Sequence, residues 1–266
     1  QTRSWSHKLS KSFLDDKLKM YVSYSNTDAR DVFAAGSSTQ GSNYGKYATC
    51  NNQFYPNLCT KPSLWGRDER WVGTLDYTAD IFGAENPTRF YLFWKRESGR
   101  RFSYTYDDNI IGDGYRDERD LWYVPTGPGD PLVSFSDDTG DAFYAYVDKY
   151  LSSYKGQVAP ANGFMAPWIT RMDLKVTQEI ALPAGSFLGD TKGELFLDIY
   201  NLGNLLDEDN GQIYDAGYLG VTKSMNVDIV DGAYVYSNFD DGHLRYRNGA
   251  RFISSWKMML GFKLSF

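Results

Sequence analysis

Apolar and polar positions alternate with a period of two in seven segments of the chain, which is the pattern of a β-strand. In the last segment, the residues of one face are Trp256, Met258, Leu260, Phe262, Leu264 and Phe266. The opposite face of that segment carries Lys257, Met259, Gly261, Lys263 and Ser265. The six earlier segments are residues 4–13, 17–31, 66–82, 88–106, 168–183 and 192–204. The pattern predicts seven antiparallel strands, each with one apolar and one polar face.

The connections between these segments alternate in length. Short connections, 14–16, 83–87 and 184–191, follow the first, third and fifth segments, whereas long ones, 32–65, 107–167 and 205–250, follow the others. Hairpins that cross a membrane show this alternation, with tight turns on one side and large loops on the other. A half-buried sheet of a soluble protein also alternates, but long structureless connections count against that alternative. We therefore expect an all-β fold, a transmembrane antiparallel β-barrel with long extracellular loops.

Aromatic residues are abundant, with 21 Tyr, 16 Phe and 7 Trp. Several stand near the ends of the apolar faces: Trp5, Trp71, Trp94, Trp168, Trp256, Phe262 and Phe266. Such rings favour the interface between membrane and water, although they can also fill the core of a β-sandwich. The net charge of −6 argues against a nucleic-acid partner, and no apolar run approaches the ~18 residues of a membrane helix. Residues 1–5 have no signal-peptide character.

The orientation follows from the end of the chain, because outer-membrane barrels end on the periplasmic side. This places the short turns in the periplasm and the long loops outside the cell. Seven is an odd number, whereas a closed bacterial barrel normally has an even number of strands, and an open edge in lipid leaves backbone groups unsatisfied. We therefore expect residues 1–266 to be the C-terminal part of a larger barrel in the bacterial outer membrane, with further chain before Gln1.

Specific motifs resemble one family. GELFLDIYNLGNLLDEDNG (193–211) is similar to the late-strand motif of TonB-dependent outer-membrane receptors. ESGRRFSYTY (97–106), GDGYRDERDLWYVP (112–125), PWITRMDLKVTQEI (167–180) and VDIVDGAYVYSNF (227–239) resemble the Oar-like branch more narrowly. Arg101 stands where that branch usually has Pro, and Glu118 and Arg119 precede Asp120 where Asn is common, which weakens the assignment of that loop.

The resemblance implies an active transporter for a large or scarce ligand, with a 22-stranded barrel, an N-terminal plug and contact with the TonB complex through an N-terminal part. The plug and the N-terminal domains are not in this sequence. The resemblance also implies that the final strand, with Phe262, Leu264 and Phe266, is the signal read by the barrel assembly machinery. Two alternatives remain open: a surface receptor or scaffold whose loops hold a partner protein, and a passive porin.

Candidate sites are few. Cys50 and Cys59, the two cysteines, flank a polar stretch and are expected to form a local disulfide in an oxidising compartment. The acidic stretch 107–120 offers Asn109, Asp113, Asp117 and Asp120 as oxygen ligands for calcium, but one ligand is missing from the loop pattern. The alternative is a solvated acidic loop with local arginine pairs.

The remaining features do not indicate an enzyme. Residues 139–154 have helical spacing and predict a helix that packs within the extracellular loops, and its exposed Tyr side chains suit a ligand surface. His7 lies on an apolar face, where an interfacial role is expected. His243 follows two acidic residues, but no nucleophile motif accompanies it. We expect no catalytic residues, and the sequence leaves the ligand-binding residues open.

Overall fold

The computed structural model describes residues 1–32, 38–39, 41, 43, 59–110, 112, 119–181, 192–217, 220–241, 244–246 and 254–265. Strands predominate in this part of the chain, and most of them pair antiparallel. No helix among the described residues is long and apolar enough to cross a membrane. The prediction of an all-β fold is confirmed at this level.

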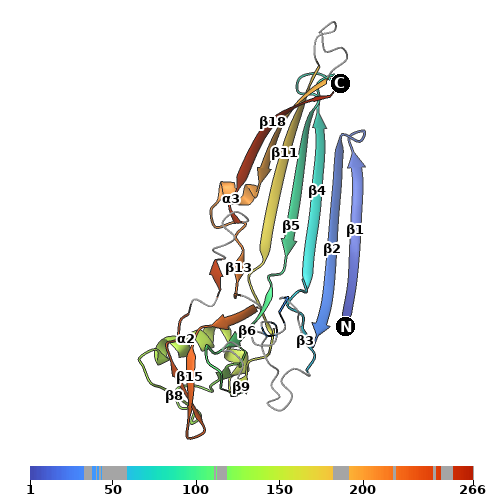
Figure 1. Cartoon of the computed structure of the whole chain (residues 1–266). Helices are drawn as coiled ribbons and strands as arrows, with labels where there is room; N and C mark the ends of the chain where they lie inside the picture. The colour runs from blue at the N-terminus through green and yellow to red at the C-terminus, as the bar shows by residue number, and fades with distance from the viewer. Residues whose placement is uncertain are drawn as a thin grey trace.

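The main sheet consists of seven long strands that pair in chain order as an antiparallel meander (Figure 1). These strands are β1 (Thr2–Phe13), β2 (Leu18–Asp31), β4 (Glu69–Ala79), β5 (Thr88–Glu97), β11 (Ile169–Ala181), β12 (Lys192–Tyr200) and β18 (Lys257–Ser265). A two-residue strand, β3 (Lys61–Pro62), pairs with the end of β2. The seven predicted strands are therefore present. Strands β1 and β18 are the two edges of this sheet and do not pair with each other in the described part of the chain.

Three predicted strands end at least three residues earlier than the sequence pattern suggests, and the segment 66–82 is one of them, because it ends at Ala79. The segment 88–106 is interrupted after Glu97, and its continuation, β6 (Arg101–Thr105), leaves the main sheet. At the break, a Cβ atom on Gly99 would lie 2.1 Å from the carbonyl oxygen of Ala166, so the chains approach too closely for a side chain. The segment 192–204 ends at Tyr200, because Asn201 adopts a left-handed conformation (φ 56°) and the short helix α3 (Leu202–Leu206) follows.

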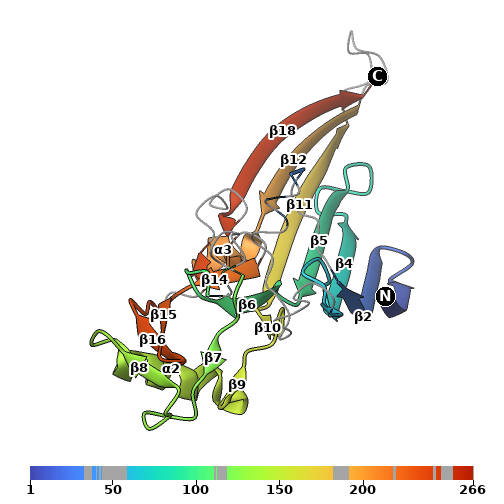
Figure 2. The ribbon, with the colours of Figure 1, turned by 60° about the horizontal axis from the view of Figure 1, so that its bottom comes forward.

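Described residues of the two longest connections form further strands and helices, and they gather beyond the C-terminal end of β5 and the N-terminal end of β11 (Figure 2). We call their described residues within 101–166 and 220–241 the loop module. Its strands are β6, β7 (Tyr123–Val124), β8 (Val133–Phe135), β9 (Gln157–Val158), β10 (Phe164–Met165), β14 (Val221–Lys223), β15 (Asn226–Val230) and β16 (Ala233–Ser237). Its helices are α2 (Gly140–Tyr150) and the 3-10 turn η1 (Ser152–Tyr154). A small pair, β13 (Tyr214–Asp215) with β17 (Arg245–Tyr246), lies outside the module.

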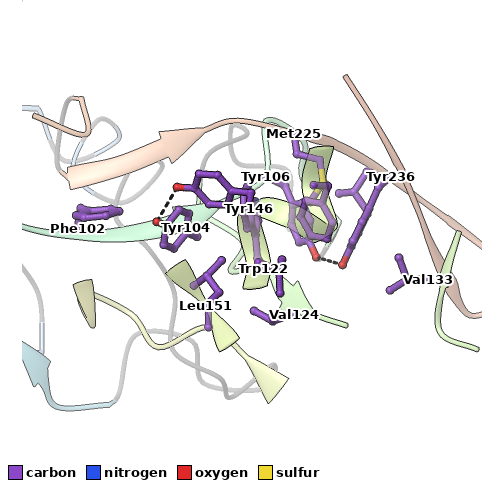
Figure 3. Close-up of a cluster of buried hydrophobic side chains, with 14 residues drawn as sticks. Phe102, Tyr104, Tyr106, Trp122, Val124, Val133, Tyr146, Leu151, Met225 and Tyr236 are labelled. Carbon is purple, nitrogen blue, oxygen red and sulfur yellow. Dashed lines mark hydrogen bonds between the residues drawn. The ribbon is translucent and has the colours of Figure 1, made fainter. Parts of the chain in front are cut away.

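The hydrophobic core lies in the loop module and not in the main sheet. Its fully buried side chains include Tyr104, Tyr106, Trp122 and Tyr236 (Figure 3). Phe143 is also fully buried in this core. The helix predicted at 139–154 is present as α2 with η1, and Phe143, Tyr146 and Val147 of α2 face this core. The motif at 227–239 forms a hairpin, in which β15 and β16 are joined by a turn at Asp231 and Gly232.

Candidate functional site

One face of the main sheet is apolar across all seven strands. The register shows this directly, because directly opposed residues on paired strands point to the same face. One row of opposed residues, running from β1 to β18, consists of Phe13, Leu18, Tyr77, Phe90, Val176, Leu197 and Leu260. The parallel row two residues away contains Lys11 and then Met20, Leu75, Leu92, Leu174, Ile199 and Met258.

This apolar face is exposed in the structure. Leu9 is 74% exposed, Leu260 69% and Phe262 54%, and His7 also lies on this face, beside Trp5. Monomeric soluble proteins rarely expose a contiguous apolar patch larger than a few hundred Å². A surface that spans seven strands therefore needs an apolar environment.

The opposite face of the sheet is polar and carries charges of both signs. Lys17 pairs with Asp80 and Arg89 pairs with Asp76. Further along the face, the Lys175 Nζ lies 3.4 Å from Asp198 Oδ1, and the Arg171 Nε lies 3.0 Å from an oxygen of Asp173. Solvent-exposed ion pairs contribute at most about 1 kcal/mol each. The charged side chains on this face therefore add little stability, and their presence indicates that the face is in contact with water.

A small hollow on the polar face lies near the short turns. Its volume is about 310 Å³, and it is lined by Asp16, Lys19, Asp76, Thr78, Pro87, Arg89, Thr177, Glu179 and Glu194. Glu179 and Glu194 are directly opposed on neighbouring strands. Like charges in such a position repel each other, which again favours a hydrated environment.

The ends of the strands shift steadily across the sheet. In the row that contains Phe13, strand β4 continues two residues past Tyr77 to Ala79, and β11 continues five residues past Val176 to Ala181. Five residues at about 3.3 Å each, over four strand spacings of about 4.8 Å, correspond to a strand tilt of roughly 40°. Strands of transmembrane barrels are tilted by about 35–45°. The tilt derived from the register of this sheet lies within that range.

Aromatic rings align on the apolar face once this tilt is applied. Trp5, Tyr24, Trp71 and Trp94 fall at one level, near the loop end of the sheet. The rings of Trp5 and Tyr24 are 5.2 Å apart, and those of Tyr24 and Trp71 are 4.5 Å apart. We call these four residues the aromatic row. Among the other aromatic residues predicted at the ends of the apolar faces, Trp168 and Trp256 lie beyond this row, outside the long strands. Phe262 lies further from the loop end, among the apolar residues of the face.

The apolar band has a height that suits a thin bilayer. On β1 the charged residues nearest to the two ends of this face are Arg3 and Lys11, eight residues apart. Eight residues correspond to about 26 Å along the strand and to roughly 20 Å along the membrane normal after the tilt. The outward apolar band of outer-membrane barrels is about 25 Å tall.

The core of the loop module contains a closed network of tyrosine hydrogen bonds. Tyr236 donates its hydroxyl to the carbonyl oxygen of Tyr123 at 2.8 Å, and the N–H of Tyr123 donates to the Tyr106 hydroxyl at 2.8 Å. The hydroxyls of Tyr106 and Tyr236 are 2.8 Å apart (Figure 3). Because the Tyr236 proton is already used, Tyr106 must be the donor between them. Burial raises the pKa of both hydroxyls far above the ordinary value, so they stay protonated.

A second tyrosine pair ties α2 to strand β6. The hydroxyls of Tyr104 and Tyr146 are 2.8 Å apart (Figure 3), and burial raises the pKa of Tyr104 to about 12. Satisfied buried polar networks favour one defined packing. The loop module is therefore a folded body with a fixed interior.

Asn162 fastens the loop module to the strand ends of the sheet. It is fully buried in a left-handed turn (φ 54°). Its amide nitrogen donates to the carbonyl oxygen of Pro62 at 2.8 Å, and its amide oxygen accepts from Ser103 at 3.0 Å. The Arg101 guanidinium donates to the Asn162 carbonyl oxygen and pairs with Asp68. The sequence reasoning missed this junction, and the Asn-Gly pair at 162–163 was its one local signal.

The calcium ligands predicted in the acidic stretch are only partly described. Asn109 and Asp120 hold the backbone of the loop: Asn109 accepts from the N–H of Gly112 at 2.9 Å, and Asp120 accepts from the N–H of Ile110 at 2.8 Å. Asp113 and Asp117 lie outside the described residues. Among the described residues, no three His, Cys, Asp or Glu side chains are grouped to hold a metal ion. The calcium site stays a prediction.

Of the other predicted site residues, some are among the described residues and some lie outside them. Cys59 is described and is not a free thiol, but Cys50 lies outside the described residues, so their disulfide stays a prediction. His243 and Phe266 also lie outside the described residues. Of the predicted assembly signal, Phe262 and Leu264 lie on the exposed apolar face of β18, opposite Leu195 and Gly193.

Comparisons with protein-family models, with curated proteins and with solved structures give no match. The site is therefore interpreted from its own geometry and from the motifs in the sequence.

Proposed function

We propose that this chain forms part of the wall and the outer loops of a β-barrel in a bacterial outer membrane. The observation that carries the proposal is the exposed apolar row that crosses all seven strands, from Phe13 to Leu260. The polar opposite face, the strand tilt of roughly 40° and the aromatic row support it. In this proposal, lipid covers the apolar face and water or other protein segments fill the space at the polar face.

The proposed activity is that of a TonB-dependent transporter for a large or scarce ligand. Support comes from the motifs, which occupy defined elements: residues 193–211 form β12 and the α3 turn, and residues 167–180 lead into β11. Residues 121–124 include Trp122 and β7 of the loop module. Neighbouring strands alternate in direction, so the first and the last of seven strands, β1 and β18, run in the same direction at the two edges of the sheet. An antiparallel closed barrel therefore requires an odd number of additional strands, which fits the proposal that these seven strands are part of a larger barrel.

The alternative function is a surface scaffold that holds a partner protein at the loops. One observation favours it: the loop module has its own core and its own hydrogen-bonded tyrosine pairs. Such a preformed surface can bind a partner without a large ordering cost. A passive porin is the less favoured alternative, and both signs of charge on the polar face give it no defined ion selectivity.

Membrane insertion is tested first. The full-length protein is expected in the outer-membrane fraction, resistant to alkaline extraction, and its folded form is expected to migrate differently from the heated form on a gel. Recovery of a folded, monomeric protein from the soluble fraction without detergent would contradict the proposal.

Transport is tested separately in cells. If the protein is a TonB-dependent transporter, growth on its scarce nutrient is lost when either this gene or the gene for TonB is deleted. If deletion of TonB leaves growth and binding unchanged while a surface partner protein is released by deletion of this gene, the scaffold alternative is correct.

A further inference from the structure

Strand β15 is an edge strand of the loop module. It belongs to a three-stranded sheet in the order β15, β16, β8, and no described strand pairs with its other side. The hairpin of β15 and β16 projects from the loop module on the side away from the main sheet (Figure 1). A strand edge of this kind offers unpaired backbone N–H and C=O groups to another chain.

The turn of this hairpin determines which backbone groups of β15 are unpaired. Asp231 and Gly232 both have positive φ, 52° and 81°, as the two central residues of a type I′ turn do. Such a turn is closed by a hydrogen-bonded pair, which here is Val230 with Ala233. Hydrogen-bonded and non-hydrogen-bonded pairs alternate along an antiparallel ladder. The backbone N–H and C=O groups of Ile229 therefore point away from β16, towards the free edge.

A contact of Val227 confirms this direction. Val227 precedes Ile229 by two residues, so its N–H points to the same side, and it donates to Asp108 Oδ2 at 2.8 Å. The N–H and the carbonyl oxygen of Ile229 have no hydrogen-bond partner in the described part of the chain. The side chains of Ile229 and Val230 are 50% and 52% exposed and lie on opposite faces of the strand. The free edge therefore combines an unpaired donor and acceptor with exposed apolar side chains.

The surroundings of this edge are acidic. Asp108 lies beside Val227, Asp228 precedes Ile229 on β15, and Asp231 lies in the turn. Asp228 and Asp231 are exposed, and none of these three carboxylates forms an ion pair with a described residue. Pairing of this edge with a second copy of β15 would bring like charges close together, which is unfavourable. A strand that carries lysine or arginine instead has complementary charge.

We propose that β15 is the docking edge for an extended, basic segment of a partner protein, which adds to this sheet as a fourth strand. The backbone of the partner pairs with Ile229, an apolar partner residue lies against the Ile229 side chain, and a basic residue next to it faces Asp228. Strand addition takes its affinity from main-chain hydrogen bonds and its specificity from alternate side chains. The inference goes beyond the proposed function, because it concerns the loop module alone and does not require the main sheet to be embedded.

The test uses the full-length protein in detergent and two capped peptides, one of alternating valine and lysine and one of alternating valine and glutamate. Hydrogen–deuterium exchange of residues 226–230 is the readout. The Ile229 N–H is expected to exchange rapidly in the peptide-free protein and to be protected by the valine–lysine peptide, but not by the valine–glutamate peptide. Added salt is expected to weaken the binding, because it screens exposed charges. The valine–lysine peptide with N-methylated amides, which cannot donate, is expected not to bind.

Two variants separate the backbone contribution from the charge. Ile229→Pro removes the outward N–H, which an edge strand tolerates, and is expected to bind the valine–lysine peptide about five- to tenfold more weakly than Ile229→Ala, which keeps that N–H. Asp228→Asn/Asp231→Asn is expected to weaken binding by roughly two- to fivefold per carboxylate. The matched control, Asp15→Asn/Asp16→Asn, removes the same charge from the exposed turn between β1 and β2 and is expected to bind as the wild type does.

Each contrary outcome overturns a defined part of the inference. Slow exchange of the Ile229 N–H without peptide would show that another part of the protein covers this edge. Equal binding of both peptides, or equal loss in the two asparagine variants, overturns the basic partner. Dimerisation that Ile229→Pro abolishes would identify a second copy as the occupant. If Ile229→Pro fails to fold, binding of the N-methylated peptide still contradicts strand addition. Membrane insertion of the main sheet is unaffected by these outcomes, since the fractionation experiment tests it separately.

Discussion

The side-chain amide of Asn201 donates a hydrogen bond of 2.7 Å to the carbonyl oxygen of Ser254, 53 residues away. Asn201 ends β12, and Ser254 precedes β18, the strand that pairs with β12. The backbone N–H of Asn201 also donates to Asp173 of β11 at 2.8 Å. One buried residue therefore connects the ends of three neighbouring strands and fixes how β18 enters the sheet.

Replacement of Asn201 by Ala is expected to destabilise the protein by about 2–4 kcal/mol, because a left-handed Ala is strained and the hydrogen bond to Ser254 is lost. Asn201→Gly removes the strain but not the loss of the hydrogen bond, so its cost is expected to be about half as large. Urea unfolding of the protein in detergent micelles measures both values. Equal stability of Asn201→Ala and wild type would show that this residue does not fix the entry of β18.

The terminal strand is also shaped by a contact between Phe196 and Gly261. These residues are directly opposed on the polar face, and a Cβ atom on Gly261 would lie 2.2 Å from the Phe196 ring. The Lys175 Nζ lies 5.0 Å from the centre of the same ring. The Phe196 ring therefore covers the backbone of Gly261, and a side chain at position 261 would have to displace this ring.

Gly261→Ala is expected to destabilise the pairing of β12 with β18 by about 1–3 kcal/mol through overpacking. Phe196→Ala removes the ring that causes the clash. In that background, Gly261→Ala is therefore expected to cost less stability than it does in the wild type. A double-mutant cycle of unfolding free energies measures this coupling. Additive effects of the two substitutions would contradict the contact.

The tyrosine network makes a prediction for the loop module. Tyr236→Phe removes the donor to the Tyr123 carbonyl oxygen and the acceptor for Tyr106, so buried polar groups lose their partners. We expect a loss of about 1–3 kcal/mol in module stability. Tyr150→Phe is the matched control, because Tyr150 is 45% exposed and its substitution is expected to change stability by less than about 0.5 kcal/mol. Hydrogen exchange of the residues in β7 and β16 reports the local effect, and equal exchange in both variants would refute it.

Lys61 gives the module junction a dependence on pH. Burial lowers the pKa of Lys61; Asp31 opposes this shift and the charge of Arg119 adds to it, and the net result is a pKa of about 7. Because the folded pKa lies below the value near 10.5 of the unfolded chain, the unfolded state binds the proton between these values. Stability at the junction therefore rises as the pH increases from about 7 to about 10.5, by at most about 1.4 kcal/mol per pH unit.

Lys61→Met is expected to remove that slope and to stabilise the junction at neutral pH. The measurement is thermal unfolding of both proteins at several pH values between 7 and 10. Lys155→Met, a substitution of a partly exposed lysine that pairs with Asp148, serves as the control and is expected to keep the slope. A Lys61→Met protein with the wild-type pH dependence would show that another group titrates.

The alternation of apolar and polar residues predicted the seven strands well, because a sheet with two different environments imposes a period of two on every strand. It failed where local backbone geometry ends a strand. β5 ends before Gly99, where another chain segment approaches closely, and β12 ends at Asn201, which has a left-handed conformation. The hydrophobic pattern of the sequence indicates neither feature. The long connections were expected to be loops, but their core joins Tyr106 to Tyr236, 130 residues apart. Such long-range packing cannot be derived from local periodicity.

The environment of the apolar face is tested most directly by two neighbouring residues on opposite faces of β18. Leu260 is 69% exposed on the apolar face, and Met259 is 47% exposed on the polar face. In water, an arginine at either position would be tolerated, because surface substitutions usually change stability by less than about 0.5 kcal/mol. In a bilayer, Leu260→Arg places a charge against lipid and is expected to cost about 2–4 kcal/mol, whereas Met259→Arg stays near zero. Unfolding in lipid vesicles measures both variants. Equal stability of the two would mean that lipid does not cover this face, and a selective loss for Leu260→Arg would place the lipid on the side that the register of the seven strands indicates.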